Sequence, residues 1–139
     1  MILADTNVVS ELMRSAPEPQ VLGWAAEIPA RGLVISVVTV QEIETGLALL
    51  PTGRRRRELE RAWSEVCASF AGAFVPFDLA ETRTTARILA TSQRSGRQMT
   101  LADAQIGGTC LAHGWTLATR NVRDFEQLPD LQVINPFGD

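Results

Sequence analysis

Lysine is absent from this sequence, and all 13 basic residues are arginine. The chain therefore has no lysine for a P-loop, for a Schiff base or for the phospho-aspartate site of a receiver domain. Histidine occurs once, at His113, and the two cysteines, Cys67 and Cys110, do not form a C-x-x-C motif. A zinc site is therefore not expected. We expect both cysteines to be free thiols in a reducing compartment, with Cys110 buried in a helix.

Long apolar runs are also missing. None approaches the roughly 20 residues that are needed to cross a bilayer. The first residues, Met1 to Asp5, have neither the basic start nor the apolar length of a secretory signal peptide. The sequence therefore predicts a cytoplasmic protein with no membrane-spanning segment.

Length and composition are ordinary for a globular protein. Of the 139 residues, 45% are apolar and 21% are charged, which predicts a single domain over residues 1–139 with a buried core. The net charge of −3 does not favour nucleic-acid binding by bulk electrostatics. It does not exclude such binding, because an acidic metal site would itself supply several of the negative charges.

Short apolar runs alternate with amphipathic stretches along the chain. Strands are predicted over residues 2–4, 33–36, 73–77, 115–119 and 132–134. Helices are predicted over residues 8–13, 17–27, 39–50, 54–71, 78–94 and 100–113, with a turn or a single helical turn at 121–125 and loops at 28–32 and 127–131. This alternation predicts an α/β fold with a mostly parallel sheet of four or five strands and right-handed crossovers.

Four acidic residues stand beside the predicted strand ends or at the starts of the helices that follow them: Asp5, Glu42, Asp103 and Asp124. Strand ends and helix starts meet at one edge of a parallel sheet, where such folds place their sites. Carboxylates gathered there repel one another unless a hard divalent cation such as Mg²⁺ or Mn²⁺ neutralises them. The pattern therefore indicates metal-dependent phosphoester chemistry.

A structural role is also open for two of these acids. Glu42 and Asp103 each lie three residues after a threonine, so both fit a capping box and would then need no further role. The same spacing recurs at Asp78 and Glu81 and at Asn121 and Asp124. Capping and metal binding are compatible, because the positive end of a helix keeps a carboxylate ionised. Asp5 has no such alternative by this reasoning, since it ends a buried strand where an unpartnered carboxylate costs several kcal/mol.

Four blocks of the sequence resemble those of PIN-domain nucleases. They are Ile2–Val8 (ILADTNV), Thr39–Ile43 (TVQEI) followed by Gly46, Leu101–Ile106 (LADAQI) and Leu117–Phe125 (LATRNVRDF). The blocks occur in the family's order and cover the chain from Met1 to about Pro136. They are most similar to the toxin subfamily of the VapBC type, including its FitB-like members.

The resemblance implies a three-layer α/β/α domain and an enzyme that cuts RNA with Mg²⁺ or Mn²⁺. Asp5, Glu42 and Asp103 match the family's core acids, and Asp124 matches a fourth acid that varies more between members. Polar positions beside the metal pocket are matched by Thr6, Asn7, Thr119 and Asn121. A strand end, turn or helix cap would explain these four residues equally well.

The resemblance also implies a cognate antitoxin protein, a homodimer and a hetero-oligomer with that antitoxin. Two alternatives remain open at this point. One is a PIN-fold nuclease that acts on DNA or in RNA maturation. The other is a non-catalytic binding module with the same fold, which is disfavoured because all four acidic positions are filled.

A run of four arginines, Arg54 to Arg57, is the main basic feature of the chain. It fits either a solvated helix start or a contact with RNA phosphates or a partner, and cations at a helix start oppose the helix dipole. Arg120 and Arg123 lie near the acids in sequence and either contact substrate phosphate or balance the acids. His113 is expected to cap a helix at its C-terminus and not to act as a base.

Overall fold

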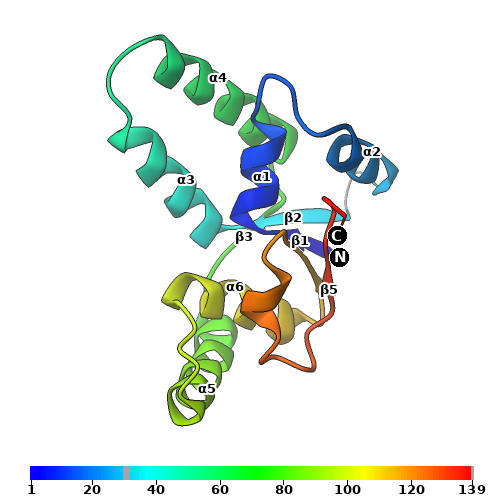
Figure 1. Ribbon diagram of the computed structural model, residues 1–139, viewed down its shortest axis with the longest axis vertical. Coiled ribbons are helices and arrows are strands. Elements are labelled where there is room, and N and C mark those ends of the chain that lie inside the picture. The colour runs from blue at the N-terminus through cyan, green and yellow to red at the C-terminus, as the bar shows by residue number, and fades with distance from the viewer. Residues whose placement is uncertain (30–31, 139) are drawn as a thin grey trace.

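A parallel sheet of five strands forms the middle layer of the computed structural model, which describes residues 1–29 and 32–138 (Figure 1). The strands are β1 (Ile2–Ala4), β2 (Leu33–Ser36), β3 (Phe74–Val75), β4 (Thr116–Ala118) and β5 (Val133–Ile134). Every strand pairing is parallel, and the order across the sheet is β3-β2-β1-β4-β5. The predicted parallel α/β sheet is therefore confirmed.

In the described part of the chain, six helices and one short 3₁₀ helix connect the strands. They are α1 (Thr6–Leu12), α2 (Pro19–Glu27), α3 (Val37–Leu49), α4 (Arg54–Ser69), α5 (Leu79–Ser95), α6 (Leu101–His113) and the 3₁₀ helix η1 (Val122–Phe125). Helices α1, α3 and α4 lie on one side of the strands and α5 and α6 on the other, which gives three layers (Figure 1). None of these helices, within the part of the chain that the structure describes, is long and apolar enough to cross a membrane.

The core is divided between the two faces of the sheet. On one face, Ile35 of β2 packs in a cluster with Val8 of α1 and Trp63 of α4. On the other face, Leu3 of β1 packs with residues of α6 and η1, among them Phe125. Successive side chains of a strand point to opposite faces, so a short buried strand contributes to both clusters. This explains why β1 and β2 are apolar along their whole length.

The strand order places β1 at the point where the chain changes direction across the sheet. From β1 the chain continues to β2 and β3 on one side, then crosses to β4 and β5 on the other. Ligands of parallel α/β sheets bind at the carboxyl ends of the strands at such a switch point. Asp5 directly follows β1, and Thr119 directly follows the neighbouring β4.

Helices α5 and α6 lie side by side and are in close contact. At Gly108 of α6 an added Cβ would come within 3.2 Å of the Cα of Thr85, so only glycine fits there. The His113 Nε2 atom lies 3.4 Å from Oε1 of the buried Glu81, and its ring stacks on Trp115. The C-cap of α6 is Gly114, so the prediction that His113 caps this helix is wrong.

Helix α3 begins earlier than predicted. The Ser36 hydroxyl accepts the backbone N–H of Val38 at 3.0 Å and makes Ser36 the N-cap. Thr39 therefore lies inside the helix, and Glu42 lies beyond the first turn. The capping-box interpretation of Glu42 is wrong for this reason, which removes the structural role that the threonine spacing had suggested.

The remaining boundaries are close to those predicted. Helix α2 begins at Pro19, two residues after the predicted Pro17. Pro19 lies in the first turn of the helix, where a proline is well placed. Strand β3 is shorter than the predicted 73–77. Of the predicted loop 28–32, positions 30–31 lie outside the described residues. Cys110 is buried in α6, as predicted, and both cysteines are free thiols.

Candidate active site

Asp5 lies at the centre of the candidate site, at the carboxyl end of β1. Its side chain is 5% exposed and accepts three hydrogen bonds. The donors are the backbone N–H of Thr6 at 2.8 Å, the Thr119 hydroxyl at 2.8 Å and the Asn7 amide at 3.3 Å. Asp5 is therefore also the N-cap of α1, and the prediction that it lacks a capping role is wrong. Burial nevertheless raises the pKa of Asp5, and the charge of Glu42 adds to this.

Thr119 joins the ends of β1 and β4. Its fully buried hydroxyl donates to Asp5 and accepts from the Asn7 side chain at 3.2 Å and from the Asn121 backbone N–H at 3.0 Å. Asn7 in turn accepts the backbone N–H of Arg120 at 3.0 Å. The predicted polar residues thus lie next to Asp5, and their hydrogen bonds fix the direction of its carboxylate. Asn121 contributes its backbone to this network.

Glu42 reaches the site from α3. The Thr6 hydroxyl donates to Glu42 Oε1 at 2.6 Å and lies 3.1 Å from the buried Thr39 hydroxyl. Glu42 is exposed to solvent, unlike Asp5. A single hydroxyl on α1 therefore holds a carboxylate of α3, the helix that follows the neighbouring strand β2.

Asp103 and Asp124 complete the acidic group. Asp103 lies in the first turn of α6, where its backbone N–H donates to the Thr100 hydroxyl at 3.1 Å. Asp124 is exposed on η1, and its N–H donates to the backbone of Asn121. The side-chain capping box suggested by the spacing of Asn121 and Asp124 is therefore absent from this described segment. Asp103 and Asp124 line one cavity of about 300 Å³.

The pKa of Asp103 shows that the charges of the other three acids disfavour its ionised form. The pKa of Asp103 is raised from 3.8 to about 6, mainly by burial and then by the charges of Asp5, Asp124 and Glu42, in that order of size. Mutual repulsion of this kind occurs when several carboxylates share one region without a counter-cation. The structure thus brings together the four acids that the sequence singled out.

These residues suit a hydrated divalent cation. Among residues 1–29 and 32–138, no three acidic, histidine or cysteine side chains converge closely enough to cage an ion by themselves. Mg²⁺ does not need such a cage, because it keeps several waters and binds through one or two carboxylates. The donors available here are carboxylate and hydroxyl oxygens, the ligand type that Mg²⁺ and Mn²⁺ prefer. The donor set and the mutual repulsion of the acids therefore fit an ion of this class.

Sequence reasoning missed Glu11, a buried acid on α1. Its carboxylate accepts the backbone N–H of Glu18 and one N–H of Arg14, both at 2.9 Å. These hydrogen bonds lower the pKa of Glu11, with the Glu18 backbone contributing most and Arg120 adding to it. Its place on the apolar side of a helix, one turn after Val8, was the available signal.

The arginine run lies at the start of α4, a position that both a solvated helix start and a contact with RNA or a partner allow. Within the helix, Arg54 Nε lies 3.0 Å from Glu58 Oε1 and Arg56 Nε lies 3.5 Å from Glu60 Oε1. These pairs follow the i,i+4 spacing and offset the unfavourable charge at the helix start. Arg55 instead lines the space between α4 and α1.

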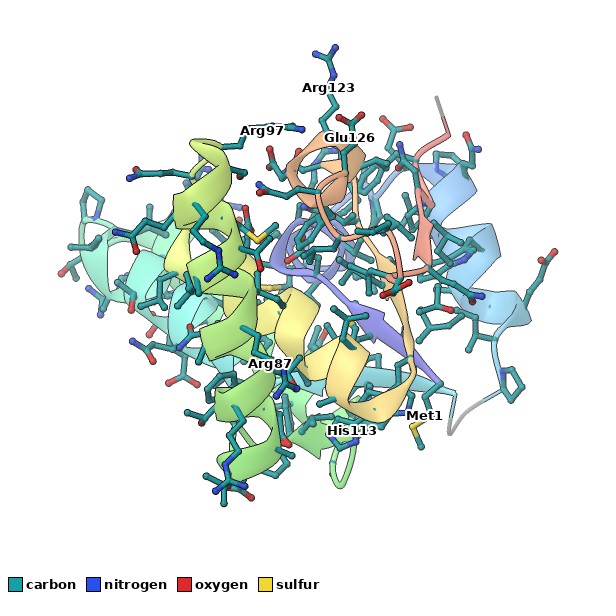
Figure 2. The ribbon with its side chains drawn as sticks, turned by 90° about the horizontal axis from the view of Figure 1, so that it is seen from below. Met1, Arg87, Arg97, His113, Arg123 and Glu126 are labelled. Atoms are coloured by element: carbon teal, nitrogen blue, oxygen red, sulfur yellow. The ribbon has the colours of Figure 1, made fainter. Side chains whose placement is uncertain are left out.

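Further arginines lie around η1. Figure 2 shows Arg97 and Arg123 at the same end of the molecule as Glu126, and Arg97 Nη2 lies 3.8 Å from Glu126 Oε2. Arg87 and His113 lie farther down in this view, away from these three residues. Arg97 and Arg123 line the same cavity as Asp103 and Asp124. Positive and negative groups are therefore adjacent on this side of the site.

Comparison with known proteins agrees with this geometry. The model of the family described as "PIN domain" matches residues 2–131. The "VapC ribonuclease Y4jK" of Sinorhizobium fredii is 40% identical over 138 residues, which cover 99% of this chain and 98% of that protein. "Toxin FitB" of Neisseria gonorrhoeae is 35% identical over 140 residues, which cover 100% of both chains.

A solved structure shares the whole fold. The structure of FitAB bound to an IR36 DNA fragment contains a chain with a TM-score of 0.88 and 34% identity, covering 100% of this chain and 97% of that one. The matched residues include all four segments that carry the acids. The chain belongs to the PIN domain family, among relatives of the VapC and FitB type.

Proposed function

We propose that this protein is a Mg²⁺- or Mn²⁺-dependent endoribonuclease that acts as the toxin of a type II toxin–antitoxin system. The observation that carries the proposal is the gathering of Asp5, Glu42, Asp103 and Asp124 from four separate segments at the switch point of the sheet. The names of the relatives, a VapC ribonuclease and the toxin FitB, support the same reaction.

In this proposal the four acids would position one or two ions, with waters completing the coordination shell. When bound, the ion neutralises charge on the phosphate and lowers the pKa of a coordinated water. Thr119 and the backbone of Thr6 fix the carboxylate of Asp5 before substrate arrives. Glu42 lies exposed at the mouth of the site and is oriented by the Thr6 hydroxyl. Glu42 or Asp103 would orient the attacking water and accept its proton.

The relatives also support a protein partner. FitB, a named toxin, is 35% identical to this chain, and the FitAB structure shares its fold. We propose a cognate antitoxin, a homodimer and a hetero-oligomer with the antitoxin, acting in the cytoplasm. The antitoxin covers the acidic groove and inserts a basic side chain among the carboxylates, which charge complementarity favours. An inhibited complex with an open, metal-loaded groove would contradict this mode of inhibition.

The test is cleavage of a structured RNA pool by the purified protein. Reactions contain Mg²⁺, Mn²⁺ or EDTA, with single-stranded DNA as a competitor, and compare the wild type with Asp5→Asn. Asparagine retains an acceptor for the Thr6 N–H but loses the charge, so we expect normal folding and loss of cleavage. Asp130→Asn, the same change at an exposed position, is the matched control and should cut normally.

The outcomes separate the remaining possibilities. Metal-dependent cutting of RNA that is lost in Asp5→Asn supports the proposal. Preferential cutting of DNA would replace it with a DNA nuclease. Absence of both cleavage and calorimetric metal binding in folded, antitoxin-free protein would favour a non-catalytic binding module.

A further inference from the structure

A cavity of about 580 Å³ opens directly beside the acidic group. Thr6, Asn7 and Glu42, which orient the site, form one of its walls, and Gly46 and Leu47 of α3 form another. A cavity of this size is within the range that binds small molecules, about 300–1,000 Å³. Among the four acids, Glu42 lines this cavity, so the cavity borders the acidic group at Glu42.

Gly46 leaves space in this cavity. No atom of the described residues that surround it lies within 4 Å of a Cβ added there, and its backbone φ is not positive. A glycine inside a helix costs about 1 kcal/mol relative to alanine. Neither a turn nor a close backbone approach explains that cost at Gly46, in contrast to Gly108. Gly46 is exposed at the edge of the cavity, and without a side chain it leaves this space open.

Arginines stand around the rim of this cavity. The guanidinium of Arg120 lies 3.8 Å from the centroid of the Phe137 ring, and its backbone N–H is bonded to Asn7. Arg14 is held by Glu11 at 2.9 Å, and Arg55 also lines the cavity. A guanidinium held over an aromatic ring loses little further freedom on binding a phosphate. The rim thus offers positive groups at fixed positions beside the apolar wall of α3.

The cavity on the other side of the acids has a different character. It measures about 300 Å³ and is lined mainly by polar and charged side chains, including Arg97 and Arg123. The larger cavity combines arginines with the apolar side chains of Leu47 and Leu50. A strand that crosses the acids would therefore meet a polar groove on one side and a partly apolar cavity on the other.

We propose that the cavity at Gly46 receives the base of the nucleotide next to the scissile phosphate, and that Arg120 contacts the adjoining phosphate. The proposal rests on the ribonuclease function above and specifies which part of the substrate the cavity receives. Proteins read unpaired RNA by accepting splayed bases into pockets with apolar and guanidinium surfaces. A paired base is held in its helix and does not reach the cavity.

The test combines a filled cavity with a missing base. Gly46→Leu projects a side chain into the cavity, and leucine is a better helix former than glycine, so α3 should remain folded. Ala48→Leu adds the same side chain to an exposed position of α3 and is the matched control. The substrates are a short RNA cut by the wild type and two versions with one abasic nucleotide, placed on either side of the cleaved bond.

We expect Gly46→Leu to lower kcat/KM on the intact RNA by about 10- to 100-fold, the scale of one stacked base. On one of the two abasic RNAs the wild type should already be slow, and Gly46→Leu should reduce the rate no further. Ala48→Leu should match the wild type on all three. Equal losses for Gly46→Leu on intact and both abasic RNAs, or no loss at all, would overturn the base pocket while leaving ribonuclease function intact.

A second measurement tests the phosphate contact. Replacing Arg120 by glutamine should lower the slope of log KM against log salt concentration by about 1, the loss of one phosphate contact. The value of kcat should change little. Arg87→Gln, on the exposed surface of the middle of α5, should leave the salt dependence unchanged. An unchanged salt dependence in Arg120→Gln would overturn the role of Arg120. Failure of the wild type to cut any RNA would instead overturn the proposed function and this inference together.

Discussion

Replacing Asp103 by asparagine should stabilise the protein while it abolishes cleavage. Without a divalent cation, burial and the nearby charges of Asp5, Asp124 and Glu42 disfavour the ionised form of Asp103, so that its pKa rises to about 6. At pH 8 the carboxyl is ionised in spite of this, and folding must accommodate the unfavourable charge. Asparagine keeps the size of the side chain and removes the charge.

The size of the gain follows from the pKa. A rise from 3.8 to about 6 corresponds to about 3 kcal/mol against the charged form. Because Asp103 is half-buried, solvent screening reduces this to about 1.5 kcal/mol. Asparagine also removes a negative charge from the first turn of α6, which costs about 0.5 kcal/mol. The net gain of about 1 kcal/mol should raise Tm by about 3 °C in a domain of this length.

The stability difference between the wild type and Asp103→Asn should depend on pH. Below about pH 4 the carboxyl is protonated in both the folded and the unfolded state, so the two proteins should have equal stability. Between about pH 4 and pH 6 the folded wild type binds a proton that the unfolded chain has released, so its stability falls as pH rises. Above this window Asp103→Asn should have its full advantage.

The assay is thermal unfolding in EDTA at pH 4, 6 and 8, repeated at pH 8 with Mg²⁺. We expect Mg²⁺ to stabilise the wild type and to have little effect on Asp103→Asn, since a ligand stabilises only the state that binds it. Asp130→Asn at an exposed position is the control and should follow the wild type. A lower Tm for Asp103→Asn than for the wild type in EDTA at pH 8 would refute the reasoning.

Three other substitutions test parts of the structure around the site. Thr119→Val removes the hydroxyl that donates to Asp5. It should lower the free energy of unfolding, measured in urea, by about 1–3 kcal/mol and the cleavage rate by at least about tenfold. Full activity would show that this hydrogen bond is dispensable. Gly108→Ala places a Cβ within 3.2 Å of Thr85 and should lower stability by about 1–3 kcal/mol. An unchanged Tm would contradict the close packing of α5 on α6. Glu81→Ala removes one half of the capping box of α5 and should lower the free energy of unfolding by about 1 kcal/mol. Faster hydrogen exchange of the first α5 amides would show that the effect arises at this helix end. Unchanged exchange there would contradict the capping role.

Much of the fold could be predicted because its signals are local. The runs at Ile2–Ala4 and Leu33–Ser36 are short and apolar, as a strand buried on both faces must be, and both strands form as predicted. Glycine stops α6 at the predicted residue because Gly114 adopts a positive φ. The acids could be identified for the same reason, since each follows such a local signal.

The missed features depend on partners that are distant in sequence or on competing caps. Ser36 and Thr39 are both capable N-caps, and the choice of Ser36 changed the interpretation of Glu42. The hydrogen bond from Thr119 to Asp5 and the contact of Arg120 with Phe137 depend on β4 lying beside β1. That neighbourhood follows from strand order, which short sequence patterns do not specify. The base cavity at Gly46 has the same origin, because α1, α3 and α4 meet there only in the folded chain.

The four acids lower the stability of the fold, and this supports a functional role for them independently of family resemblance. A chain selected for its fold alone would gain stability by losing charge at Asp103, where three other carboxylates oppose ionisation. Asp5 is buried at 5% exposure and needs three hydrogen-bond donors to be accommodated. Strain of this kind persists where a site needs it and the surrounding packing compensates for it. Here the two clusters on either face of the sheet supply the stability that the acids remove, and a bound cation would relieve the repulsion that remains.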